Sequence, residues 1–234
     1  MAEHSETTGR ETVITALLDA ALPMVAFEGW SNQLLVNAAA DAGIDPGIAL
    51  AACPRRGLDL ALAFHRRGDM ALKQWLESED LGALRFRDRV AAAVKFRLES
   101  VREHREAVRK STALFAVPVN AHHGSRALWE TSDLIWNCLG DRSDDVNWYS
   151  KRTLLSAVLG ASVLYWLGDS SEDLEATRLF IDRRIDDVMQ IEKVKAKARG
   201  HPQFAYLMRG LDGLGRKIRP PSDRGAFPGW VSRG

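Results

Sequence analysis

Histidine pairs and carboxylate pairs are the residues of this chain that come nearest to a catalytic or metal-binding pattern. His122 and His123 are adjacent, and because adjacent helical side chains point about 100° apart, they would chelate one metal ion poorly. The carboxylate pairs at 144–145 and 186–187 are typical of helix caps and surfaces. The sequence contains no Cys-x-x-Cys, His-x-x-x-His, Glu-x-x-His, glycine-rich phosphate loop or Gly-x-Ser-x-Gly motif. It therefore predicts a protein that is not an enzyme and that holds no metal ion or other cofactor.

The overall composition indicates a folded core with no general attraction to polyanions. Hydrophobic residues make up 46% of the 234 positions and charged residues 27%, which favours a packed domain over disorder. The formal net charge of +1 gives no global drive toward nucleic acid. Cys53 and Cys138 lie far apart, so we expect reduced, buried thiols in a cytosol-like compartment. No apolar run approaches the ~20 residues that span a bilayer.

Helical periodicity runs through the chain, and no stretch shows the sustained period-two alternation of a strand. We therefore expect an all-α protein of about nine or ten helices. The expected helices cover residues 12–28, 32–42, 46–52, 58–79, 86–110 and 125–139, followed by two antiparallel helices within 144–190. The last two should be joined by a turn at 168–171, where Ser170 and Asp173 fit a capping box.

Three short helices joined through a glycine turn make the N-terminal region look like a helix-turn-helix unit. The stretch LLDAALPMVAFEGWSNQLLVNAAADAGIDPGIALAA resembles the N-terminal domain of the TetR family of regulators. A DNA-reading helix presents basic and amide side chains, but residues 46–52 offer only small and apolar ones, and the nearest basic residues are Arg55 and Arg56. We therefore expect a degenerate helix-turn-helix kept as packing scaffold and no nucleic-acid partner. A TetR-type transcription regulator with a hydrophobic ligand stays open as the alternative.

The C-terminal stretch 203–219 combines an apolar stripe with a basic rim. Its basic residues include Arg209, Arg216 and Lys217, against a single Asp212. Such a helix suits the surface of an anionic membrane, although a helix docked on the protein body is the alternative. The expected membrane-binding residues are Phe204, Leu207, Met208, Leu211, Leu214 and Ile218.

A longer resemblance begins at residue 144. The stretch DDVNWYSKRTLLSAVLGASVLYWLGDSSEDLEATRLFIDRRIDDVM resembles the accessory lipid-binding protein family of coenzyme Q (ubiquinone) biosynthesis, which has a TetR-like fold. The matching residues are Asn147, Trp148, Tyr149, Arg152, Asp169, Ser170, Ser171, Asp173, Arg178, Phe180, Arg183, Ile185 and Asp187. The similarity continues more weakly through 84–140 and 12–80.

This resemblance implies a homodimer that binds an isoprenoid quinone or phospholipid and presents quinone intermediates to the demethoxyubiquinone hydroxylase. It also implies a docking surface for the hydroxylase. An exposed Trp–Tyr pair beside a guanidinium is typical of binding hot spots. The alternatives are that Trp148 packs inward as core and that Asp144 or Asn147 only caps the helix. The docking residues that the resemblance implies are Asp144, Asn147, Trp148, Tyr149 and Arg152.

Long apolar helices around bulky aromatic residues can line a cavity for an apolar ligand, and the chain contains seven tryptophans. The expected lipid-binding residues are Leu114, Phe115, Leu128, Trp129, Trp136, Leu155, Val158, Leu159 and Phe180.

We expect a helix-turn-helix-like region over 1–80, a lipid-binding and dimerisation domain over 81–200 and an amphipathic membrane tail over 201–234. The lack of a transit-peptide pattern at the N-terminus favours a bacterial protein, peripheral to the inner face of the cytoplasmic membrane. In a eukaryote the corresponding place is the matrix face of the mitochondrial inner membrane.

Overall fold

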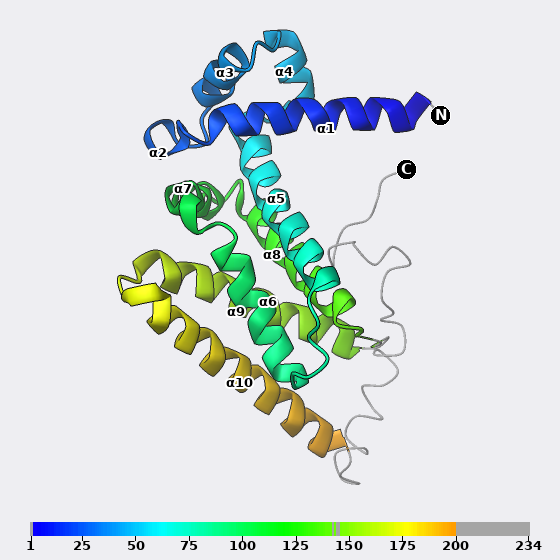
Figure 1. The fold of residues 1–234 in the computed structure, drawn as a ribbon. Helices are drawn as coiled ribbons and strands as arrows, with labels where there is room; N and C mark the ends of the chain where they lie inside the picture. Colours follow the sequence, from blue (N-terminus) through cyan, green and yellow to red (C-terminus); the bar gives the residue numbers. More distant parts are fainter. Residues whose placement is uncertain (1, 142, 144–145, 200–234) are drawn as a thin grey trace. The chain divides into compact units, whose positions relative to one another are not determined.

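The computed structural model describes residues 2–141, 143 and 146–199, with the side chains of 2–8, 146–147 and 191–199 left outside the description. Over these residues the regular elements are ten α-helices and two short 3₁₀ helices, without a strand. This confirms the prediction of an all-α protein of about nine or ten helices. Figure 1 shows the helices with the labels used below.

Contacts between residues divide the chain into two compact units. Unit 1 contains residues 1–71 and 100–127, and unit 2 contains residues 72–99 and those from 128 onward. Helix α5 (Gly57–Ser78) and helix α8 (Ala121–Cys138) each contribute residues to both units. The boundaries expected from the sequence near residues 80 and 200 stay predictions.

Unit 1 carries the helix-turn-helix-like elements. Helix α1 (Ala2–Ala21) packs against α3 (Asn32–Asp41) and α4 (Pro46–Ala52), while α2 (Val25–Glu28) packs against α7 (Arg105–Ala116) (Figure 1). The predictions for α3 and α4 are confirmed.

Side-chain caps and a proline explain where these helices begin and end. Asp45 caps α4 by accepting hydrogen bonds from the backbone N–H groups of Gly47 at 2.7 Å and Ile48 at 3.2 Å. The prediction of one helix over 12–28 is wrong. Helix α1 begins earlier and ends at Ala21 because Pro23 lacks an N–H and disfavours helical geometry in the residue before it.

Unit 2 is built on an antiparallel helix pair. Helices α9 (Val146–Gly168) and α10 (Glu175–Arg199) pack along each other, and α6 (Phe86–Glu99) packs against both (Figure 1). The interior of this unit is apolar, with Trp166, Ile185 and Leu155 at most 1% exposed. Burial of such side chains is the main favourable term in folding. This arrangement confirms the expected helical hairpin.

A single helix over 86–110 was expected, and that expectation is wrong. The chain leaves α6 at Glu99, passes through a 3₁₀ turn, η1 (Arg102–His104), and starts α7 at Arg105. No proline or glycine marks the break in the sequence. The break falls where the chain passes from unit 2 to unit 1, so tertiary packing overrides a continuous helical pattern.

The turn between α9 and α10 is held by Asp169 rather than by the expected Ser170–Asp173 capping box. The carboxylate of Asp169 accepts hydrogen bonds from the backbone N–H groups of Ser171 and Thr177, both at 2.8 Å, and from the Thr177 hydroxyl at 2.5 Å. The hydrogen bonds from Thr177, followed by those from Ser171, outweigh the effect of burial and hold the pKa of Asp169 far below its ordinary value. Asp173 instead adopts a left-handed backbone conformation with φ of 47°.

Two further expectations concern compartment and membrane. Both cysteines are free, but only Cys53 is buried, so the expectation that Cys138 is buried is wrong. Among the helices that the structure describes, none is long and apolar enough to cross a bilayer.

Candidate functional site

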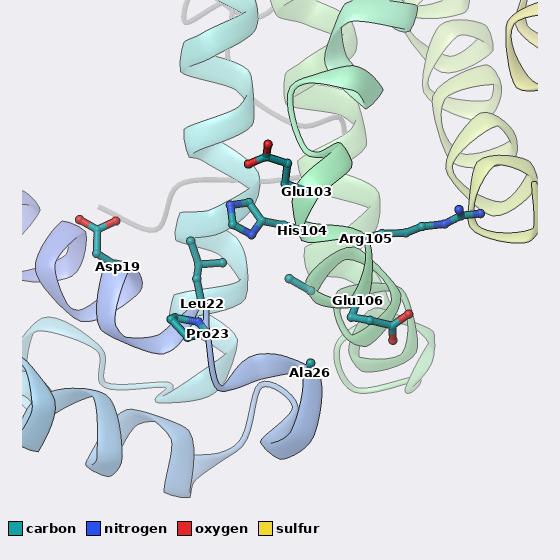
Figure 2. A pocket seen from close by; sticks show the side chains of 9 residues that line it. Asp19, Leu22, Pro23, Ala26, Glu103, His104, Arg105 and Glu106 are labelled. Atoms are coloured by element: carbon teal, nitrogen blue, oxygen red, sulfur yellow. The ribbon is translucent and has the colours of Figure 1, made fainter. Parts of the chain in front are cut away.

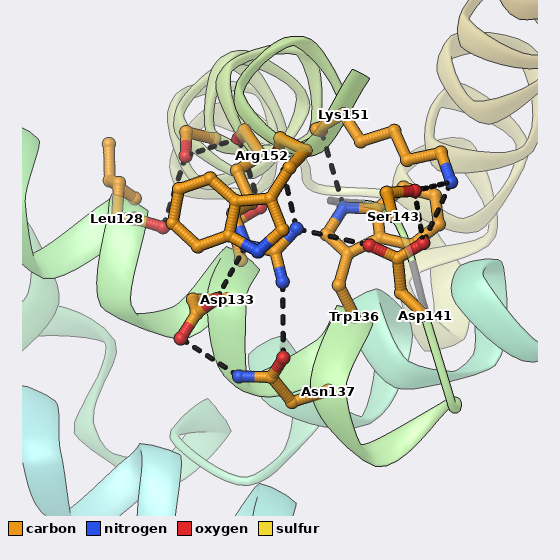
Figure 3. Close-up of polar contacts among 11 residues, drawn as sticks. Leu128, Asp133, Trp136, Asn137, Asp141, Ser143, Lys151 and Arg152 are labelled. Carbon is orange, nitrogen blue, oxygen red and sulfur yellow. Dashed lines mark hydrogen bonds and ion pairs between the residues drawn. The ribbon is translucent and has the colours of Figure 1, made fainter. Parts of the chain in front are cut away.

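A fully buried guanidinium ties the start of α9 to α8. Arg152 Nε donates to Asp133 Oδ1 at 2.5 Å, and Nη1 donates to Asp141 Oδ2 at 3.1 Å and to the Trp148 carbonyl at 3.2 Å (Figure 3). Nη2 donates to Asn137 Oδ1 at 3.1 Å. Asp133 and Asn137 lie on α8, whereas Asp141 lies in the loop that follows it. The guanidinium therefore joins three successive segments of unit 2.

Lys151 extends this network to the loop between α8 and α9. Its Nζ lies 2.7 Å from Asp141 Oδ1 and 2.6 Å from the Ser143 hydroxyl (Figure 3). Burial alone would raise the pKa of Asp141, but hydrogen bonds from Lys151, Ser143 and Arg152 together outweigh burial and hold it below its ordinary value. Asp141 is therefore a carboxylate at neutral pH.

The charges of this cluster balance. Two cations, Arg152 and Lys151, face two carboxylates, Asp133 and Asp141, and the side chain of Arg152 is 0% exposed. A buried charge costs several kcal/mol unless it is paired and hydrogen-bonded, so removing one member leaves the others uncompensated. The cluster therefore fixes how the first turns of α9 pack on α8.

The Arg152 cluster includes two of the residues that were expected to dock a partner, Trp148 and Arg152. Trp148 is only 2% exposed, and the Arg152 guanidinium carbon lies 4.0 Å from the centre of its ring. The expectation of an exposed Trp–Tyr pair beside a guanidinium is therefore wrong, because both Trp148 and Arg152 pack inward. Tyr149 is half-buried. Asp144 lies outside the described residues, and so does the side chain of Asn147.

Seven of the nine expected lipid-binding residues belong to unit 2 and two, Leu114 and Phe115, to unit 1. Leu128 approaches Gly160, where an added Cβ would lie 3.3 Å from Leu128 Cδ1, so α8 and α9 are in close contact there. Phe180 is half-buried and stacks on Tyr165 with ring centres 4.3 Å apart. The fully buried members of the set are Trp129, Trp136, Leu155, Val158 and Leu159.

A pocket of about 540 Å³ opens in unit 1 and is lined by a different set of residues (Figure 2). Leu22, Pro23 and Ala26 line its apolar side. Its remaining lining residues, mostly charged, are Asp19, Glu103, His104, Arg105, Glu106 and Ala107. Three of its lining residues are carboxylates, and none of the nine expected lipid-binding residues lines it.

The helix that a DNA-binding relative would use for reading is apolar on its outside. Ile48 and Leu50 of α4 are 53% and 44% exposed. Arg55, beyond the end of α4, is bound to Asp59 through contacts of 2.6 and 2.9 Å. These side chains do not provide the base-edge and phosphate contacts of a reading helix.

The C-terminal half of α9 has no charged residue at all between 153 and 168, although part of it faces solvent. Leu164 is 61% exposed and Tyr165 39% exposed, and Leu179 of α10 is 50% exposed. Contiguous exposed apolar surface of this kind marks interaction sites. The absence of charge over this run is visible in the sequence, although Thr153 within it is polar and exposed.

The membrane-binding residues expected in the tail cannot be placed. Phe204, Leu207, Met208, Leu211, Leu214 and Ile218 all lie outside the described residues.

Comparison with known sequences gives a consistent picture. The family model described as COQ9 matches residues 121–192. The mitochondrial ubiquinone biosynthesis protein coq9 of Dictyostelium discoideum is 29% identical over 185 residues, which cover 76% of this chain and 60% of that protein. Human COQ9, also named as a mitochondrial ubiquinone biosynthesis protein, is 27% identical over 230 residues, covering 92% of this chain and 72% of its own length. The chain thus spans less than two thirds of the Dictyostelium relative.

Comparison with solved structures shows the fold. A TetR transcriptional regulator from Nitrosomonas europaea superposes with a TM-score of 0.61 over 74% of this chain and 95% of its own, at 17% sequence identity. The expected TetR-like fold is confirmed. At this identity, the likeness does not extend to the activity of the regulator.

Proposed function

From the match of residues 121–192 to the COQ9 family model and from the relatives named as ubiquinone biosynthesis proteins, we propose that this chain is a COQ9-type, non-catalytic protein of ubiquinone biosynthesis. In this role it presents an isoprenoid quinone intermediate to the demethoxyubiquinone hydroxylase. The observation that carries the proposal is where the family match falls. Residues 121–192 cover α8, α9 and most of α10. The same elements hold seven of the nine lipid-binding candidates and the Arg152 cluster. The segment that matches the family model therefore also contains most of the proposed lipid-binding residues and the charged cluster that holds α9 on α8.

The isoprenoid chain is assigned to the apolar side chains of unit 2, with the seven candidates of that unit as its proposed contacts. Trp129 and Trp148 meet with ring centres 5.7 Å apart, and Trp136 meets Phe86 at 5.6 Å. Long apolar ligands gain affinity mainly from the apolar surface that they bury. A quinone with a prenyl tail has that surface, whereas the charged pocket of unit 1 suits a polar ligand.

Hydroxylase docking is assigned to the start of α9, with Tyr149 as its contact residue. The Tyr149 ring lies 4.8 Å from the Trp148 ring at 80°, and 6.3 Å from the Trp129 ring. Trp148 and Arg152 position Tyr149 from inside and do not touch the partner themselves. Tyrosine held rigidly by its neighbours is a common binding hot spot, because little side-chain entropy is lost on association.

Binding of the purified hydroxylase to variants of this chain tests the docking assignment. Tyr149→Ala is expected to weaken the dissociation constant roughly 30-fold, the size of a hot-spot loss. Thr153→Ala, which removes an exposed side chain one helical turn further along α9, is the matched control and should bind as the wild type does. Equal affinity of the Tyr149→Ala variant would remove the docking assignment while leaving lipid binding untouched.

A second copy of the chain is the proposed partner of the uncharged face of α9 and its neighbour Leu179. An apolar face that meets its own copy is buried from both sides, which suits a two-fold symmetric dimer. The proposal rests on the exposure of Leu164, Tyr165 and Leu179.

The tail, residues 203–219, is proposed to hold the protein at the membrane that contains its lipid. This part of the proposal rests on the sequence pattern of an apolar stripe with a basic rim. The relatives are named as mitochondrial proteins, so their names lend no support to a bacterial membrane face. The peripheral position itself is what lipid transfer requires.

A further inference from the structure

The loop between α7 and α8 exposes apolar side chains at its tip. Val117 is 45% exposed and Val119 is 71% exposed, and Pro118 between them is also exposed. Ala113 and Ala116, at the end of α7, are exposed as well. Two valines and a proline at the tip of a solvent-facing loop are unusual, because such tips normally carry polar residues.

Local hydrogen bonds hold this tip in one conformation. The backbone N–H of Asn120 donates to the Val117 carbonyl at 2.8 Å, and the Asn120 side-chain amide donates to the Leu114 carbonyl at 3.2 Å. Behind the turn, α8 lies directly on α7: a Cβ added to Gly124 would lie 2.7 Å from Phe115 Cβ. The valines are therefore presented by a rigid turn.

The same hydrogen bonds reduce the cost of moving the tip out of water. An unpaired backbone N–H or C=O is expensive in an apolar medium, whereas a paired one is not. Pro118 has no N–H to pair, and the Pro118 carbonyl accepts a hydrogen bond from the Ala121 N–H at 3.3 Å. The carbonyl groups of Val117 and Pro118 are thus already paired within the turn.

Along the chain, the residues on either side of the tip carry charges of one sign. No Asp or Glu occurs between Glu106 and Glu130, whereas Arg109, Lys110 and Arg126 lie within that stretch. His122 and His123 add two titratable groups at the start of α8. Arg109 is paired with Glu106 at 3.1 Å, whereas no acidic residue lies between Glu106 and Glu130 in the sequence. An apolar tip within such a basic stretch matches a surface that is apolar inside and negatively charged at its face, as an anionic bilayer is.

We propose that the loop at 117–120 inserts into an anionic membrane surface and is a second membrane contact, separate from the tail. It rests on the proposed function only in sharing the membrane to which the tail is assigned; its evidence comes from described residues of unit 1. The valines enter the interface between headgroups and acyl chains, while Lys110 and Arg126 stay among the headgroups. Leu114 and Phe115, two of the lipid-binding candidates, follow directly behind the inserted tip along α7.

Fluorescence from a single environment-sensitive label tests the insertion in the full chain. The label is attached through Val119→Cys in a Cys138→Ser background. The remaining Cys53 is buried, and burial with the nearby Asp59 charge raises its pKa to about 11, so it does not compete for the label. Val36→Cys on α3, where Val36 is 56% exposed in the same unit, provides the matched control.

With phosphatidylcholine vesicles that contain phosphatidylglycerol, the label at position 119 should shift to the blue and brighten several-fold, and the label at position 36 should not. The response should weaken in pure phosphatidylcholine and at high salt. In the unlabelled chain, Val117→Ser with Val119→Ser should lower vesicle binding roughly tenfold, whereas Val36→Ser should leave it unchanged.

A tail variant separates this inference from the proposed function. If Leu207→Ser with Leu211→Ser abolishes vesicle binding, and the labelled chain with an unchanged tail binds vesicles while its label at 119 stays in water, the loop inference is wrong and the tail proposal stands. If the chain does not bind anionic vesicles at all, both are wrong. A response at 119 that follows protein concentration without vesicles would assign the tip to contact between copies and overturn the membrane assignment.

Discussion

The N-terminal half of α9 buries charge, whereas the C-terminal half carries no charge and exposes apolar surface. At the beginning of the helix, Arg152 is enclosed by two carboxylates, an amide and a tryptophan ring. Two turns and more further on, Leu164 and Tyr165 face solvent. The hydrogen bonds around Arg152 fix the position of each group, because each bond requires one geometry. The exposed apolar side chains can contact partners in several orientations, because apolar contact depends mainly on the area buried. One helix therefore combines a fixed half with a half that is free to associate.

The largest expected effect comes from breaking the fixed half. Arg152→Met leaves Asp133 and Asp141 buried without their shared cation, and we expect it to lower the free energy of unfolding by about 3–5 kcal/mol. Urea unfolding followed by circular dichroism measures this change. Arg183→Met, at an exposed position on α10, is the control and should change stability by less than about 0.5 kcal/mol.

Restoring the balance of charge sharpens the same test. Arg152→Met combined with Asp133→Asn removes the carboxylate that is left uncompensated, because Asp141 keeps its pairing with Lys151, so part of the lost stability should return. If the double variant is as unstable as the sum of its parts, packing of the arginine stem rather than charge pairing explains its burial.

Substitutions on the exposed apolar half of α9 should change self-association rather than folding stability. Leu164→Asp places a charge on the proposed dimer face, and we expect it to weaken association by roughly 2 kcal/mol, or about 30-fold. Sedimentation velocity over a range of protein concentrations measures this. Leu84→Asp, at another exposed leucine of unit 2 outside the helix pair, should leave association unchanged. A Leu164→Asp chain that associates as the wild type does would contradict the assignment of this face.

A smaller effect should depend on pH. Asp141→Asn removes the carboxylate that binds Lys151 and Arg152, and at neutral pH we expect a loss of about 1–2 kcal/mol of unfolding free energy. Because the folded-state pKa of Asp141 is depressed, its contribution is present above the ordinary carboxyl pKa of about 4 and is lost as the pH falls below it. Thermal unfolding of both proteins between neutral and acid pH should therefore converge at low pH. Asp41→Asn, at an exposed site, should differ little from the wild type throughout.

Local signals in the sequence were sufficient for much of the fold. Asp45 before Pro46 marks the start of α4, and the run from 144 to 190 reads as two helices because its apolar spacing is helical on both sides of Gly168. The break after Glu99 could not be found in the same way. It carries no helix-breaking residue, and it depends on α6 and α7 packing in different units.

The orientation of the residues expected to dock a partner could not be predicted from the sequence. The resemblance pointed to the start of α9, yet sequence spacing could not show that Trp148 and Arg152 turn inward. That depends on Asp133, Asn137 and Asp141, whose own roles appear only when α8 and its following loop are folded against α9. These three residues recur every four positions, but that spacing alone does not identify Arg152 as their partner.

Organic extraction of the purified chain, followed by mass spectrometry, tests the central claim most directly. We predict that an isoprenoid quinone or its precursor is enriched in the extract relative to the total lipid of the expressing cells, and that the Arg152→Met variant, if it remains folded, retains less of it. An extract that contains only phospholipid in the proportions of the host membrane, or no lipid at all from a protein purified without detergent, would contradict the proposal that this protein presents a quinone intermediate.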